Sequence, residues 1–217
     1  MPLVIEHNTR EFKPVPAGTH LALCTMIVNI GVQDNSKFEP RPKLYIRWEI
    51  PDERVTWIDR KGSEHSGPAT IGRFYTKSLA PKANLRRDLE IWRGKSFTES
   101  ELRAFDVAIF LGRACQLSVV HKEGPERISA NVAAISAPPR GAKPKPSGKL
   151  VLFDADNWDD ETFAELPPWL QQLIKDRIVN APAQKIAPEP EHSKEPVAVH
   201  GRNAVAAKPE LDDRIPF

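Results

Sequence analysis

Strand patterns dominate the first 139 residues and are interrupted once by helical ones. A run of β-forming residues at 19–31 predicts a long strand, bent or bulged because apolar residues fall on both of its faces. Apolar and polar residues then alternate strictly until Pro51-Asp52, which marks a turn. The expected elements are strands over 19–31, 43–50, 55–58 and 69–77, with a loop at 60–68.

A helical pattern follows these strands. Leu85, Leu89 and Trp92 recur at the spacing of one helix face. They predict a helix over 85–93, with Asn84 as its N-cap.

The remaining elements complete a mainly β fold. Thr98 with Glu101 three residues later is a capping-box pattern and predicts a second short helix. Strand patterns return at 115–122 and 128–136. Five or six antiparallel strands with a helical insert between the third and fourth is the order of a small OB-fold-like barrel, the oligonucleotide-binding type.

The chain changes character after residue 139. Six acidic residues fall within 154–165, and apolar residues then recur at helical spacing, which predicts an amphipathic helix that docks on an apolar surface. Those apolar residues are Trp169, Leu170, Leu173 and Ile174. We expect an extended arm at 1–18, the OB-like domain at 19–139, a basic linker at 140–149, an acidic loop with the amphipathic helix at 150–178, and a disordered tail at 179–217.

Charge is distributed unevenly along the chain. Residues 1–150 hold 24 Lys and Arg against 16 Asp and Glu, which gives +8, whereas residues 151–217 hold 7 against 13, which gives −6. A basic body indicates an anionic ligand, and the acidic part would compete with that ligand.

Two basic–aromatic–basic stripes indicate what that ligand is. Because successive strand residues point to opposite faces, Lys43, Tyr45 and Arg47 share a face, and Arg73, Tyr75 and Lys77 share one by the same rule. Phenol rings stack on unpaired bases, and the flanking cations reach phosphates. The alternative is an ordinary solvated sheet face. The predicted single-stranded DNA interface comprises Lys43, Tyr45, Arg47, Arg73, Tyr75, Lys77, Lys82, Arg86 and Arg87.

The last six residues, Asp212-Asp213-Arg214-Ile215-Pro216-Phe217, combine acids, an aromatic anchor and the C-terminal carboxylate expected there. This ending resembles the acidic tip of bacterial-type single-stranded DNA-binding proteins, with Arg214 where that family has Asp. The resemblance covers these six residues only and suggests a phage-encoded relative. It implies recruitment of replication or recombination enzymes through Asp212, Asp213, Ile215, Pro216 and Phe217.

Other classes of function have little support in the sequence. Cys24 and Cys115 lie in apolar runs without a C-x-x-C pair, which predicts buried reduced thiols. The acidic run at 154–161 lacks the glycine of a calcium loop, so we expect no metal and no cofactor. No signal peptide or membrane span is expected, and a cytoplasmic location follows.

The sequence therefore predicts sequence-tolerant binding and protection of single-stranded DNA, without catalysis and with a homo-oligomer left open. The alternative is a non-catalytic protein–protein adaptor built from the β-domain and the terminal motif.

Overall fold

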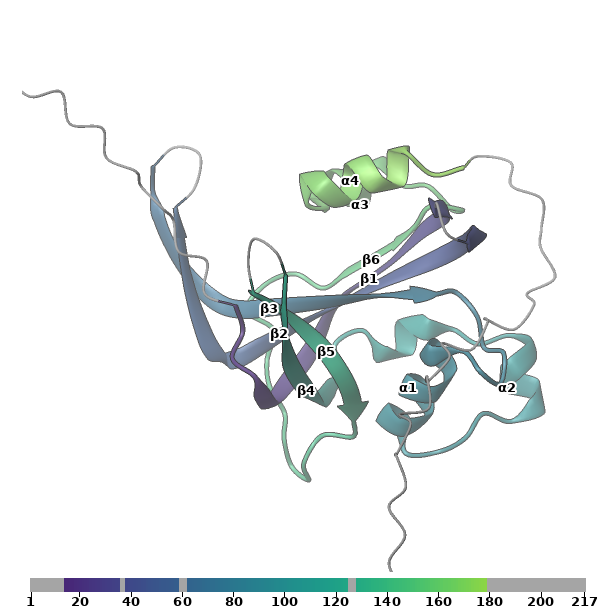
Figure 1. The fold of residues 1–217 in the computed structure, drawn as a ribbon, viewed down its shortest axis with the longest axis horizontal. Helices are drawn as coiled ribbons and strands as arrows, with labels where there is room; N and C mark the ends of the chain where they lie inside the picture. The colour runs from purple at the N-terminus through teal and green to yellow at the C-terminus, as the bar shows by residue number, and fades with distance from the viewer. Residues whose placement is uncertain (1–13, 36–37, 59–61, 125–127, 179–217) are drawn as a thin grey trace, which may run out of the picture.

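The computed structural model describes residues 14–35, 38–58, 62–124 and 128–178 (Figure 1). Its strands are β1 (Gly18–Asn35), β2 (Phe38–Ile58), β3 (Glu64–Thr76), β4 (Ala114–Glu123), β5 (Ile128–Ser136) and β6 (Val151–Asp154). Its helices are α1 (Asn84–Arg93), α2 (Glu99–Arg103), the 3-10 turn η1 (Val107–Phe110), α3 (Asp160–Glu165) and α4 (Pro168–Lys175).

One curled sheet organises these elements. Five strands run antiparallel in the order β3-β2-β1-β4-β5, and β6 pairs in parallel with β1. The first part of β1 pairs with β4 and its later part with β2, so β1 serves both halves of the sheet. The connection from β3 to β4 carries α1, α2 and η1, which lie together on one side of the curl (Figure 1). The prediction of a mainly β fold with a helical insert between the third and fourth strands is confirmed.

The sequence predicted the bulge in β1 correctly, but it predicted a turn inside β2 that the structure does not have. β1 carries register shifts at Cys24/Met26 and at Asn29/Gly31, which confirms the predicted bulged strand. The turn predicted at Pro51-Asp52 is wrong, because β2 runs through it as one strand with a register shift between Ile50 and Arg54. A bulge absorbs these residues without reversing the chain. Much of the loop predicted at 60–68 also belongs to β3.

The sheet separates two hydrophobic clusters. The inner cluster fills the curl between the strands and α1, and it includes Ile46, Trp48, Leu89 and Trp92. The outer cluster lies on the opposite face of β1 and β2, where β6 and α4 cover it. Figure 1 shows α4 lying across this outer side. Both faces of β1 are therefore buried, which explains why apolar residues appear on both sides of that strand.

In the helical insert, the predicted N-cap of α2 is confirmed, whereas the predicted N-cap of α1 is wrong. Thr98 Oγ1 accepts from Glu101 N–H, and the Glu101 carboxylate accepts from Thr98 N–H, so the capping box at α2 is confirmed. The Asn84 cap is wrong, because α1 begins at Asn84 and its N-cap position is Ala83, without a side-chain cap.

The two cysteines lie in the described part of the chain. Cys24 and Cys115 are buried free thiols, as predicted, and burial raises the pKa of Cys24 to about 12. Among the described helices, none combines the length and apolarity that crossing a bilayer requires.

Candidate nucleic-acid interface

The two tyrosines of the predicted stripes point to opposite faces of the sheet. Tyr75 is 3% exposed and belongs to the inner cluster. Its hydroxyl donates to Asp88 Oδ2 of α1 at 3.1 Å, and the Arg73 guanidinium lies 5.0 Å from its ring centroid and 3.0 Å from the same carboxylate oxygen. Burial raises the pKa of Tyr75, with the Asp88 charge adding to the shift. The prediction that Tyr75 faces solvent is wrong.

Tyr45 lies on the outer face but is also covered. Only 7% of it is exposed, and burial raises its pKa while the nearby Arg47 charge opposes the shift. Its ring centroid is 4.8 Å from Phe74 and 5.3 Å from Trp169 of α4. The prediction of a freely exposed Tyr45 is therefore wrong as well, although Lys43, Tyr45 and Arg47 do alternate with the core residues of β2.

Strand register explains why the β3 prediction failed. Tyr45 pairs with Phe74, and Leu44 pairs with Tyr75. Cross-strand partners share a face, so Phe74 must join Tyr45 outside and Tyr75 must join Leu44 inside. The two strands carry the same motif, but the pairing of β2 with β3 decides which face each residue of β3 occupies.

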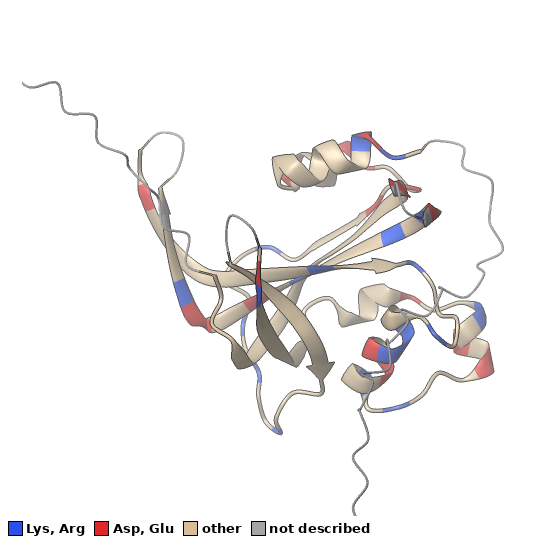
Figure 2. Ribbon diagram, viewed as in Figure 1, with Lys and Arg blue, Asp and Glu red and all other residues tan. Residues whose placement is uncertain are grey.

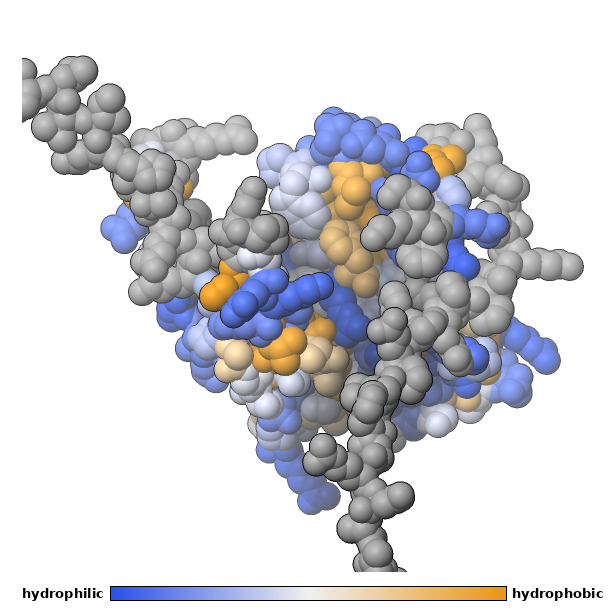
Figure 3. Space-filling view, viewed as in Figure 1, coloured by the Kyte–Doolittle hydropathy of each residue, from blue (hydrophilic) through white to orange (hydrophobic). Residues whose placement is uncertain are grey.

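The outer face consequently carries an aromatic platform, which we define as Tyr45, Phe74 and Trp169. Phe74 is 49% exposed and Trp169 is 50% exposed, and their ring centroids lie 6.3 Å apart. Figure 3 shows apolar surface at and below α4 on this side of the molecule. Phe74 and Trp169 meet edge to face, with 78° between their planes, so each half-exposed ring could contact a separate base.

Gly72 makes room for this platform. It lies two residues before Phe74 on β3, and a Cβ atom there would lie 2.1 Å from Tyr45 Oη and 2.4 Å from Tyr45 Cζ. The Tyr45 ring therefore passes over the bare backbone of β3 on its way to Phe74 and Trp169. Any side chain at residue 72 would push the ring away from this position.

Two predicted cations, Lys43 and Arg47, lie on the same face of β2 as Tyr45, and a third, Lys77, lies just beyond the end of β3. Lys43 Nζ donates to Thr76 Oγ1 at 2.9 Å on the same strand pair. Lys77 Nζ lies 3.3 Å from Asp156 Oδ2, with both groups well exposed, so this ion pair is readily exchanged for another anion. Arg47 follows Tyr45 by two residues and pairs with Gly72. Lys43 and Arg47 therefore share a face with Tyr45, whereas Lys77 follows β3 in the phase of the inner residues Arg73 and Tyr75.

The other predicted cations lie elsewhere and are engaged with α1. Arg73 belongs to the buried Tyr75–Asp88 group. Arg86 binds Glu90 at 3.2 Å, and Arg87 lies 3.3 Å from Asp88. Lys82 is exposed just before α1 and also makes an interaction. Figure 2 accordingly shows Lys and Arg on β2, on β3 and on α1 rather than on one continuous face.

The predicted partner-binding residues lie outside the described residues. These are Asp212, Asp213, Ile215, Pro216 and Phe217. The predicted arm at 1–18 is described only from residue 14, and the predicted tail at 179–217 lies wholly outside.

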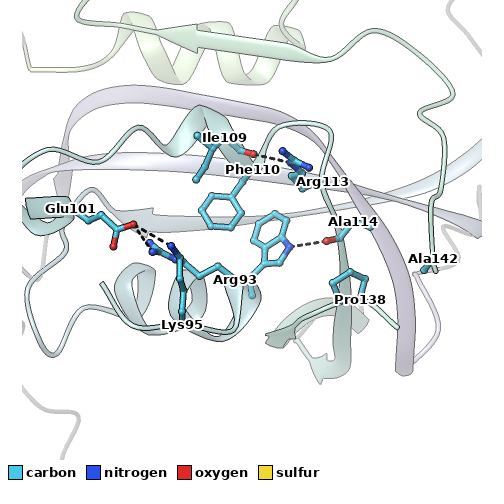
Figure 4. Close-up of a pocket in the computed structure, with 10 residues that line it drawn as sticks. Arg93, Lys95, Glu101, Ile109, Phe110, Arg113, Ala114, Pro138 and Ala142 are labelled. Atoms are coloured by element: carbon cyan, nitrogen blue, oxygen red, sulfur yellow. Dashed lines mark hydrogen bonds and ion pairs between the residues drawn. The ribbon is translucent and has the colours of Figure 1, made fainter. Parts of the chain in front are cut away.

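A separate pocket of about 520 Å³ lies between α1, η1 and β4 (Figure 4). Each of its cations has a partner: Arg93 binds Glu101 at 2.5 Å, Lys95 lies 3.7 Å from the same carboxylate, and Arg113 donates to the Ile109 carbonyl. Arg93 Nη1 is nevertheless buried without a hydrogen bond to any described residue. Trp92 in its wall donates to the Ala114 carbonyl at 2.8 Å, as expected for a packing residue. We assign this pocket no role in nucleic-acid binding.

A scan against protein-family models and a search of curated proteins found no match to the chain. The site is therefore interpreted from its own geometry.

Sequence reasoning misses Phe74 and Trp169 as surface aromatics. The motif around Tyr75 assigns Phe74 to the core, because the two residues are neighbours along the strand. Helical spacing assigns Trp169 to the docking face of its helix, although Leu170 and Ile174 are the residues that α4 buries. The missing signal is the register of β2 against β3, which neither strand carries in its own sequence.

Proposed function

We propose that the protein binds single-stranded DNA, without catalysis, through the outer face of β2 and β3. The aromatic platform would stack on bases, and Lys43 and Arg47 would meet the phosphates. The platform is the observation that supports this proposal most, since Phe74 and Trp169 are each about half exposed and are held by different elements, β3 and α4.

We further propose that residues 18–136 form an OB-type domain. The strand order β3-β2-β1-β4-β5 supports this assignment, as does the position of α1 between β3 and β4. β3 and β5, the two ends of that order, also come into contact. In OB folds the outer surface of the second and third strands is where oligonucleotides bind, which is the surface that carries the platform here.

Protection of single strands during replication or recombination is the biological role we propose, with partner enzymes recruited through 212–217. The support for recruitment is the sequence of that segment alone, and Arg214 would weaken its attraction to a basic pocket. Binding and recruitment would then be carried by separate parts of the chain.

Fluorescence anisotropy of the full-length protein with a labelled oligo-dT tests the binding proposal. The wild type should bind with an affinity that falls steeply as salt rises, because counterions are released. Phe74→Ala and Trp169→Ala should each weaken binding by about 5- to 150-fold, the range for losing one stacked base. Ile91→Ala is the matched control, since Ile91 is 47% exposed on α1 and should leave affinity unchanged.

Absence of binding at low salt would exclude the proposed function. Wild-type binding that survives removal of both rings would exclude the platform as the binding surface and would direct attention to another face.

A further inference from the structure

We propose that a groove beside the aromatic platform binds a backbone phosphate of the same DNA strand, with Arg47 and Thr25 as its ligands. This inference rests on the proposed function and extends it from bases to a specific phosphodiester contact. The chemical class of the ligand is a phosphodiester anion.

The groove has a volume of about 440 Å³ and lies on the outer side of β1, β2 and β3. The β2 register shift between Ile50 and Arg54 lies at its margin, where β2 and β3 resume pairing with Arg54 opposite Pro68. The segment 147–149, which leads into β6, closes its other side. Thr25, Arg47, Arg54 and Lys149 all contribute to its walls.

Arg47 carries one of four buried side-chain atoms that lack a hydrogen-bond partner among the described residues, and it is the cation of this groove that indicates an anion. Its guanidinium is half-buried and makes no hydrogen bond or ion pair with any described residue, and its Nε is buried without a partner. A guanidinium carries five N–H donors, and leaving the buried Nε–H of Arg47 unused costs free energy. An incoming phosphate would satisfy those donors in the bidentate geometry that guanidinium favours.

Thr25 presents a second unused donor in the same groove. It is 3% exposed, and its hydroxyl is buried without a hydrogen-bond partner in the described part of the chain. Valine has nearly the same shape and would avoid this cost, so the hydroxyl is unexplained by packing. The groove is therefore lined by two buried polar groups that lack partners among the described residues. An oxygen-rich ligand that binds both of them would explain this.

The charge of the groove also favours an anion. Its lining holds three cations, Arg47, Arg54 and Lys149, and one carboxylate, Glu49, for a formal charge of +2. Glu49 is tied to the segment at 147–149, because it accepts from Ser147 N–H at 3.0 Å and from the Ser147 hydroxyl at 2.6 Å. Lys149 pairs with Glu165, and the lysine end of this pair is largely solvent-accessible.

Because the groove lies beside the platform, the phosphate would come from the same DNA strand whose bases stack on the platform. Arg47 and Tyr45 are two residues apart on one face of β2, or roughly 7 Å along the strand. Their partners Gly72 and Phe74 are spaced in the same way on β3. A nucleotide whose base lies on the platform would therefore place its backbone next to the groove.

Anisotropy titrations of full-length Arg47→Gln and Thr25→Val variants with oligo-dT test this inference. Arg47→Gln should weaken binding at least about tenfold and make the slope of log affinity against log salt shallower by about 0.7. Thr25→Val should weaken binding about two- to tenfold. Both variants should unfold at the wild-type denaturant concentration or above it, because each removes an unpartnered buried group.

Two controls separate a phosphate contact from other effects. Arg103→Gln removes an exposed cation on α2, away from the groove, and should leave the salt slope unchanged. A dT oligonucleotide with uncharged methylphosphonate linkages should bind the wild type and Arg47→Gln equally, because it offers Arg47 no charged phosphate in either complex.

The outcomes distinguish this inference from the proposed function. Wild-type protein that binds no oligo-dT overturns both. Normal wild-type binding with an unchanged affinity and salt slope in Arg47→Gln overturns the groove alone. A marked loss of stability in either variant would instead give Arg47 or Thr25 a structural role and would also contradict the inference.

Discussion

Tyr45 and Tyr75 occupy the same basic–aromatic–basic motif on neighbouring strands, yet they serve opposite faces of the sheet. Tyr75 enters the inner cluster and donates to the buried Asp88 carboxylate, with Arg73 beside both. Tyr45 lies outside, against Phe74 and Trp169. Strand register therefore decides which residues share a face, and Phe74 is the aromatic residue that β3 places on the outer face.

The polar groups next to Tyr75 and those in the groove next to Tyr45 also differ in their partners. Around Tyr75 the polar groups have partners, because its hydroxyl and the Arg73 guanidinium both donate to the Asp88 carboxylate. On the outer face Arg47 Nε and the Thr25 hydroxyl have none among the described residues, and in the inner cluster Trp48 Nε1 also lacks one. A buried polar group without a partner requires an explanation, and for the two that line one groove we propose a bound ligand.

The largest expected effect of a single substitution is on the inner face. Tyr75→Ala should lower the free energy of unfolding by about 3–5 kcal/mol, the range for removing a large buried aromatic. Urea unfolding followed by circular dichroism measures this change. A decrease below about 1 kcal/mol would contradict the structural role of Tyr75, since it would fall well under that range. Phe74→Ala, on the same strand but half exposed, should cost much less stability.

A somewhat smaller effect is expected where α4 anchors the outer face. Leu170 of α4 is fully buried against the sheet, so Leu170→Ala should cost about 2–5 kcal/mol of packing energy. Because Trp169 is its neighbour, oligo-dT affinity should fall together with the stability of α4. Hydrogen exchange of residues 168–175 locates the change. Reduced protection of this segment without any fall in affinity would separate Trp169 from binding.

Gly72→Ala should disturb the platform by displacing the Tyr45 ring. A Cβ atom at this position overlaps the Tyr45 ring, so the ring must move away from Phe74 and Trp169. We expect a cost of about 1–3 kcal/mol from overpacking, with weaker oligo-dT binding. Thr56→Ala, at an exposed position of β2 outside the lining of the groove, is the control. Unchanged stability and affinity in Gly72→Ala would show that the position of Tyr45 is unimportant.

The smallest expected effect is the pH dependence of the α2 capping box, far from either tyrosine. The hydrogen bond from Thr98 N–H and the Arg93 guanidinium hold the pKa of Glu101 below its usual range. Its stabilising contribution is therefore present above the unfolded-state pKa and is lost as pH falls through the lower folded-state pKa.

Thermal unfolding of the wild type and of Glu101→Gln from neutral pH into acid measures this contribution. The two melting temperatures should differ at neutral pH and converge in acid. A difference that stays constant with pH would contradict the assigned pKa shift.

Local patterns predicted the elements better than they predicted the site. The bulged β1, the helix face of Leu85, Leu89 and Trp92, and the Thr98 capping box all follow from residues close together in sequence. The faces of β3 depend instead on pairing with β2, a separate segment of the chain. The exposure of Trp169 depends on α4 docking against β1, at the other end of the described chain. Such long-range contacts leave no periodic signal in either segment.

The most direct test of the central claim is to map where single-stranded DNA touches the protein. Full-length protein is cross-linked to oligo-dT by ultraviolet light, digested, and the modified peptides are identified by mass spectrometry. Our account predicts cross-links at Phe74 and Trp169, on peptides from β3 and α4. Cross-links confined to α1 or to the β4–β5 hairpin would contradict it.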